Sequence, residues 1–75
     1  MPTWTVHLFA YLKERHGATV NVRTGDTAGE ILSALATIGI DARSCRLAVD
    51  NEFVTTDTVI DPNSQIAVIP PVSGG

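Results

Sequence analysis

The fold of this chain is decided by residues 27–40, TAGEILSALATIGI. Thr27 stands three residues before Glu30, which is the spacing of a capping box at the start of a helix. Gly39 stands where a left-handed glycine ends a helix, and Ile40 can supply the hydrophobic contact that follows such an end. Between these signals the apolar residues recur at helical spacing and form one stripe, made by Ala28, Ile31, Leu32, Leu35 and Ile38. The stretch therefore predicts one amphipathic helix.

Short stretches on both sides of this helix predict β-strands. Apolar and polar residues alternate in residues 3–8, 19–23, 47–49 and 65–69, and residues 53–54 begin a short return strand. We expect a loop or a short helical turn at residues 10–17. Turn-forming residues occupy positions 24–26, 50–52 and 61–64.

The predicted element order is strand, strand, helix, strand, short strand and strand. One helix packed across one sheet buries the apolar faces of both. This order is that of the ubiquitin-like β-grasp, an α+β fold with a mixed sheet of four to five strands and one main helix across one face. In that fold the last strand is central, and its end leads into the C-terminal segment. We therefore expect a β-grasp domain over residues 1–69 and an extended tail over residues 70–75.

Composition excludes several classes of function. The 75 residues carry five basic and eight acidic side chains, a net charge of −3, which argues against nucleic acid and weakly favours protein partners with basic docking sites. No apolar run approaches the roughly 20 residues of a membrane span, so we expect no membrane association. The single cysteine allows no internal disulfide and fits a reducing cytoplasm.

The tail joins a stiff segment to a flexible tip. Its two prolines fix two φ angles and form a short extended rod, while its two glycines form a thin tip that can enter a narrow tunnel. The α-carboxylate at the tip is ionised at neutral pH. A glycine pair at a chain end can also be frayed and unimportant. The tail consists of Pro70, Pro71, Val72, Ser73, Gly74 and Gly75.

Three stretches resemble the small subunits of molybdopterin synthase, which are ubiquitin-like sulfur carriers. Residues 6–14, VHLFAYLKE, resemble that family's Phe-Ala-x-Leu-Arg-Glu motif, and residues 47–54, LAVDNEFV, resemble its Ala-Val-Asn-x-x-x-Val hairpin. Residues 68–75, VIPPVSGG, are close to the family's own ending. The sequence departs from the family at residues 61–65, DPNSQ, where an acidic pair is usual, and at Lys13, where arginine is usual.

The resemblance implies a carrier whose chemistry rests on the Gly75 carboxylate. An adenylylating enzyme that resembles ubiquitin-activating enzymes would activate this carboxylate with ATP, and a sulfur donor protein would convert it to a thiocarboxylate. The tail would then enter a pocket on the large subunit of molybdopterin synthase and deliver sulfur to a cyclic pterin precursor. The chain itself would bind no cofactor and no metal. The tail would form the partner contacts, together with an open sheet face bearing Phe9, Phe53 and Ile69.

Other functions remain open at this point. The chain can be a sulfur carrier for thiamine, cysteine or tRNA thiolation, a ubiquitin-like protein modifier that uses the same carboxylate, or a β-grasp interaction module with an inert tail. A nucleophilic role for Cys45 has some support because Arg43 and Arg46 can lower its pKa, but a lone cysteine is commonly a small apolar residue. His7 and His16 lack metal-ligand spacing, and we interpret the charged residues 13–16 as solvated.

Overall fold

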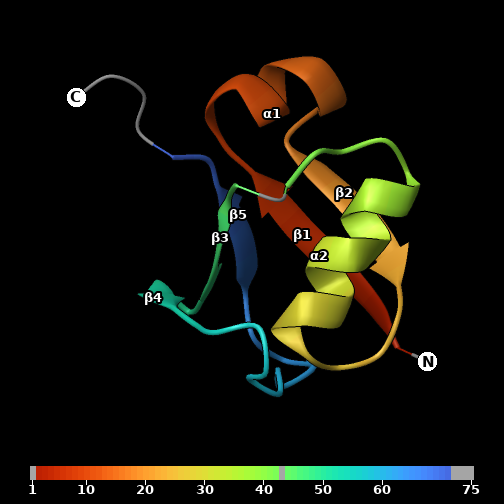
Figure 1. Ribbon diagram of the computed structural model, residues 1–75, viewed down its shortest axis with the longest axis vertical. Coiled ribbons are helices and arrows are strands. Elements are labelled where there is room, and N and C mark those ends of the chain that lie inside the picture. The colour runs from red at the N-terminus through yellow and green to blue at the C-terminus, as the bar shows by residue number, and fades with distance from the viewer. Residues whose placement is uncertain (1, 43, 72–75) are drawn as a thin grey trace.

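The computed structural model in Figure 1 describes residues 2–42 and 44–71 and forms one sheet with two helices. The elements follow one another as β1 (Thr3–Leu8), α1 (Ala10–His16), β2 (Thr19–Arg23), α2 (Ala28–Thr37), β3 (Arg46–Val49), β4 (Glu52–Phe53) and β5 (Ile66–Ile69). The strand order across the sheet is β2-β1-β5-β3-β4. The predicted ubiquitin-like fold with a mixed sheet and one main helix is therefore confirmed, and the stretch at residues 10–17 is mostly helical.

The last strand lies at the centre of the sheet. β5 runs parallel to β1, with Leu8 opposite Val68, and antiparallel to β3, with Leu47 opposite the same Val68. β1 also pairs with β2 as an antiparallel hairpin, as the alternation at residues 3–8 and 19–23 predicts. Because β5 is held on both edges, the chain that follows Ile69 leaves from a rigid position.

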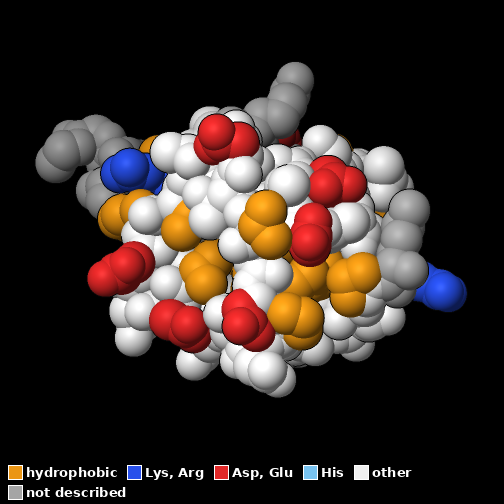
Figure 2. All heavy atoms as spheres, turned by 90° about the horizontal axis from the view of Figure 1, so that it is seen from below, with side chains coloured by type: hydrophobic (Ala, Val, Ile, Leu, Met, Phe, Trp, Pro, Cys, Tyr) orange, Lys and Arg blue, Asp and Glu red, His pale blue; other side chains and the backbone are white. Residues whose placement is uncertain are grey.

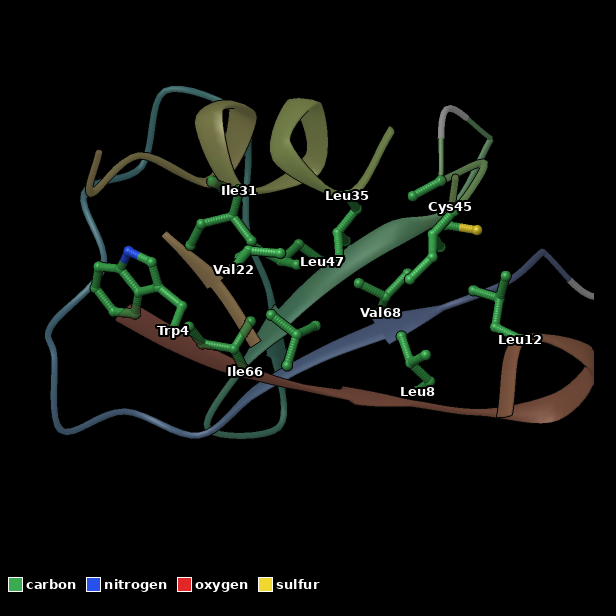
Figure 3. Packing of buried hydrophobic residues seen from close by; sticks show 14 of the residues in the cluster. Trp4, Leu8, Leu12, Val22, Ile31, Leu35, Cys45, Leu47, Ile66 and Val68 are labelled. Carbon is green, nitrogen blue, oxygen red and sulfur yellow. The ribbon is translucent and has the colours of Figure 1, made fainter. Parts of the chain in front are cut away.

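The core lies between the sheet and α2, which crosses one face of it (Figures 1 and 3). The side chains that face α2 come from alternate positions of the central strands and are almost completely buried, as expected for strands with one covered face. They include Trp4, Val6, Leu8, Leu47, Ile66 and Val68. Trp4 also donates its indole N–H to the Gly25 carbonyl at 3.0 Å, which satisfies its one polar atom.

The start of α2 is the predicted capping box. The Thr27 hydroxyl accepts from the Glu30 backbone N–H at 3.3 Å, and the Glu30 carboxylate accepts from the Thr27 backbone N–H at 3.4 Å. Two backbone N–H groups that the helix leaves unpaired are thus satisfied.

The end of α2 differs from the prediction at one residue. Ile38 was assigned to the apolar stripe, but its side chain is 52% exposed. The helix ends at Thr37, and Ile38 is the cap residue with a non-helical backbone, so the stripe stops at Leu35. Gly39 has the predicted left-handed φ of 91° and returns the chain toward the core, where Ile40 is buried and donates its N–H to Leu35.

The end of the sheet away from the tail carries acidic turns. In the turn before β5, the Asp61 carboxylate accepts from the Asn63 backbone N–H at 2.8 Å, so the turn predicted there is present. The Asp50 carboxylate accepts from the Gln65 backbone N–H, also at 2.8 Å, and joins this turn to the β3–β4 hairpin. Figure 2 shows this end of the molecule, with Asp and Glu side chains spread across it and Lys or Arg only at its margins. No helix among residues 2–42 and 44–71 is long and apolar enough to cross a membrane.

The capping box predicts a measurable contribution to stability. Thr27→Ala removes one cap bond and should lower the free energy of unfolding by about 1 kcal/mol. The matched control is Thr37→Ala, because the Thr37 hydroxyl only bonds the Ala34 carbonyl within the last turn of the helix. That change should alter stability by less than about 0.5 kcal/mol. Urea unfolding followed by circular dichroism compares the two variants, and equal losses would contradict a special role for the box.

Candidate functional site

The sheet face opposite α2 contains a small apolar hollow. Its floor is made by Ala48 and Ala67, which are register partners on β3 and β5. Phe53 lies directly opposite Ala48 on β4, so its ring rises beside this floor. The hollow has a volume of about 150 Å³ and is lined by Phe9, Ala48, Asn51, Phe53, Gln65, Ala67 and Ile69. Small residues at the base and large ones at the rim therefore create a hollow on this face of the sheet.

The three residues predicted for a partner surface all border this hollow. Phe9 is 46% exposed and Phe53 is 51% exposed, while Ile69 is half-buried. Phe9 follows β1 and precedes Ala10, whose φ of 53° is unusual for a residue with a Cβ. This sharp turn of the backbone comes where the chain passes from β1 into α1. The structure thus brings Phe9, Phe53 and Ile69 together, as the alternation along the strands suggested.

Arg46 belongs to the same surface, and sequence reasoning missed it. Arg46 pairs with Ile69 at the end of β5, and its side chain is exposed. Its guanidinium carbon lies 4.2 Å from the centroid of the Phe53 ring, within cation–π range. The signal in the sequence is that Arg46 and Ala48 are two residues apart on β3, so their side chains lie on the same face of the sheet, which is the open face. That signal becomes useful only once the register with β4 and β5 is known.

The root of the tail is fixed to the domain. Pro70 is buried although it belongs to the predicted rod, and Pro71 is exposed. The part of the rod that a partner can contact therefore begins at Pro71. The predicted site residues Val72, Ser73, Gly74 and Gly75 lie outside the described residues.

Cys45 does not have the surroundings of a nucleophile. Its side chain is only 8% exposed, and it lies at the same end of the core as Leu12 (Figure 3). Burial raises the pKa of the Cys45 thiol, and a hydrogen bond with Tyr11 opposes this only in part. The expectation that Arg46 lowers this pKa is therefore wrong, because the Arg46 side chain lies against Phe53 on the open face. Arg43 lies outside the described residues.

The remaining candidate residues do not form a site. His7 is half-buried on β1 opposite Thr19, and His16 is exposed at the end of α1. Within residues 2–42 and 44–71, no group of His, Cys, Asp and Glu side chains is arranged to hold a metal ion. A wider hollow of about 670 Å³ lies between α2 and Thr56, but it contains none of the predicted site residues. The candidate site is therefore the open sheet face beside the root of the tail.

Comparison with known proteins gives relatives that share the whole domain. SAMP1 from Haloferax volcanii is 28% identical, with a TM-score of 0.73, and the match covers 99% of this chain and 100% of that one. The structure of small archaeal modifier protein 1 from H. volcanii is 26% identical to this chain, with a TM-score of 0.71, over 93% of this chain and 98% of that one. The fold is also that of a chain in the complex of subunits 1 and 2 of molybdopterin-converting factor from Helicobacter pylori 26695. That chain is 21% identical with a TM-score of 0.61, over 99% of this chain and 100% of that one.

A match to a protein family covers nearly all of the chain. The ThiS family matches residues 6–75, which include all seven helices and strands except the first residues of β1. The match also includes the glycine pair of the tail. This chain therefore belongs to the ThiS family of ubiquitin-like sulfur carriers.

Proposed function

We propose that this protein is the small, sulfur-carrying subunit of a molybdopterin synthase. The observation that carries the proposal is the central position of β5, whose end passes from the middle of the sheet through buried Pro70 into the tail. A strand held on both edges gives the tail a fixed starting point. The Gly75 carboxylate would then be presented to partners at a defined distance from the open sheet face.

The chemistry requires only this carboxylate from the carrier. One oxygen of the ionised carboxylate attacks the α-phosphorus of ATP on an activating enzyme, and pyrophosphate leaves. Hydrosulfide released by a donor protein then attacks the acyl carbon, and AMP and a proton leave. The product is a thiocarboxylate whose sulfur passes to a cyclic pterin precursor on the large subunit, while water supplies the oxygen that restores the Gly75 carboxylate. The partners would supply the alignment and the electrostatic stabilisation, which account for much of the catalysis in such transfers.

A second function is favoured by one comparison. The chain is 28% identical to SAMP1, and the related structure is described as a small archaeal modifier protein. A modifier would use the same activated carboxylate, but a lysine amine of a target protein would attack it and an isopeptide bond would form. Carrier and modifier therefore share the activation step and differ in the nucleophile that follows. The opening motif and the double proline lead us to place the molybdopterin branch first.

Intact-mass measurement separates these functions. The protein isolated from its own cells should show the mass increase of one oxygen replaced by sulfur, and it should co-purify with a pterin-binding large subunit. Deletion of Gly75 should abolish both the sulfur addition and any sulfur donation. Protein-linked adducts in cells that lack deconjugating activity would favour the modifier. A carrier function would be rejected if neither modification formed or if the Gly75 deletion still donated sulfur.

The tip should not tolerate a side chain. Gly74→Val places a branched side chain next to the reacting carboxylate, where the tail must pass a constriction beside the activating site, so thiocarboxylation should be blocked. The fold should be unchanged, because residue 74 follows the last strand by several positions. A reconstituted activation reaction measures the first effect, and circular dichroism checks the second. Normal thiolation of this variant would show that no such constriction exists.

The Cys45 thiol should be dispensable for the transfer. Since Cys45 is buried and burial raises its pKa, little thiolate forms near neutral pH. Cys45→Ala should therefore form the thiocarboxylate at the rate of the unmodified chain, with at most a modest loss of stability. Mass spectrometry of a timed activation reaction measures that rate. Loss of thiolation in a folded Cys45→Ala protein would indicate a thioester step on the carrier itself.

A further inference from the structure

The hollow on the open face has the size of a receptor for one side chain. Its volume is about 150 Å³, its floor is formed by two alanines, and its rim includes two exposed phenyl rings. An apolar side chain inserted between these rings would remove the exposed aromatic surface from water without displacing any polar group of the floor. Aromatic residues around a central pocket are typical of the positions that dominate binding energy in protein interfaces.

One positive charge stands at the edge of this hollow, on the side of the tail. Arg46 is opposite Ile69, the last residue of β5, and its guanidinium lies over the Phe53 ring. In the described part of the chain, no ion pair joins Arg46 to a carboxylate of its own domain. One face of the guanidinium lies against the Phe53 ring, and within residues 2–42 and 44–71 no hydrogen bond joins the Arg46 N–H groups to another side chain. A planar group fixed in this way loses little freedom when it binds a carboxylate.

The local charge differs from the net charge of the protein. The net charge is −3, but Asp26, Asp57 and Asp61 belong to the loops that lead into α2 and β5, and Figure 1 shows these loops at the end away from the tail. Lys13 and Arg15 are exposed on α1 at the tail end of the sheet, and Asp50 and Glu52 belong to the β3–β4 hairpin. Among these charged side chains, Arg46 is the one whose charge lies against an aromatic ring of the hollow. Electrostatic complementarity at such a position sets the choice of partner and the rate of association more than the total affinity.

We propose that Arg46 makes this surface selective for a partner that sets a carboxylate beside the apolar side chain filling the hollow. The inference rests on the proposed function, because it needs a partner that binds this face and the tail together. Activation of the carboxylate is common to the carrier and the modifier. The partner is therefore an adenylylating enzyme whose carrier-binding groove pairs an aliphatic or aromatic side chain with an aspartate or a glutamate. Phe53 positions the guanidinium, and Arg46 determines specificity without touching the reacting atoms.

The test uses the full-length protein and the purified activating enzyme of the same organism. Carrier-dependent exchange of pyrophosphate into ATP is measured against carrier concentration, which separates the KM for the carrier from kcat. Arg46→Met keeps an unbranched side chain against Phe53 but removes the charge, and its KM should rise about tenfold while kcat is unchanged. Arg46→Lys should recover most of the affinity, and Arg46→Glu should raise KM further than Arg46→Met because it repels the partner's carboxylate.

The matched control is Arg23→Met. Arg23 is also an exposed arginine on a strand, but β2 forms the edge of the sheet opposite β4. Its removal should leave KM unchanged. The KM of the unmodified chain should also rise with added salt, and this dependence should be weaker in Arg46→Met, since the lost contact is a screened ion pair. Thermal unfolding of each variant establishes that the fold is retained.

The possible outcomes distinguish the two proposals. If the unmodified chain supports exchange and Arg46→Met has an unchanged KM, the inference is wrong while the proposed function stands. Equal effects of Arg46→Met and Arg23→Met would also overturn the inference, because they would show attraction to the whole protein rather than to this surface. If the unmodified chain supports no exchange at all, the proposed function fails and the inference falls with it.

Discussion

The rest of the structure depends on the pairing of β5 between β1 and β3. The parallel ladder joins Val6, His7 and Leu8 to β5, and the antiparallel ladder joins all four β3 residues to the same strand. Parallel neighbours need a long crossover between them, and most of the chain, including α2, lies between β1 and β5. The sheet is therefore continuous only when β5 pairs with both β1 and β3, and the same pairing fixes the start of the tail.

The side chains of β5 alternate between the core, where they contribute to stability, and the open face, where they are available to a partner. Ile66 and Val68 are at most 1% exposed beneath α2, whereas Ala67 and Ile69 lie on the uncovered face. Ala67 contributes to the hollow because a larger side chain there would fill it. Successive side chains of β5 point to opposite faces of the sheet. The same four-residue strand therefore contributes two residues to the core and two to the open face.

The features that the sequence predicted well are local ones. The capping box and the left-handed Gly39 are set by residues within a few positions of each other, so α2 could be placed before the fold was known. The exposure of Ile38 was missed because the helix ends one residue earlier than the apolar spacing suggests. The contact of Arg46 with Phe53 was missed for another reason, since it depends on the register of the β3–β4 hairpin. The placement of Cys45 likewise depends on how α1 packs over the end of the core, which no local pattern specifies.

Net charge describes the molecule as a whole and not the surface beside the tail. The excess of acidic residues suggests partners with basic docking sites, but this sum averages over a molecule 35 Å long. Salt screens exposed charges over about 8–10 Å, so the acidic residues of the loops before α2 and β5 act less on a partner beside the tail than the nearer Asp50 and Glu52 of the β3–β4 hairpin. The hollow, the Phe53 ring and the Arg46 guanidinium lie together on the open face beside the root of the tail. The position of Arg46 relative to the tail therefore describes this surface better than the net charge does, because a protein of the same net charge without that cation would present a different surface.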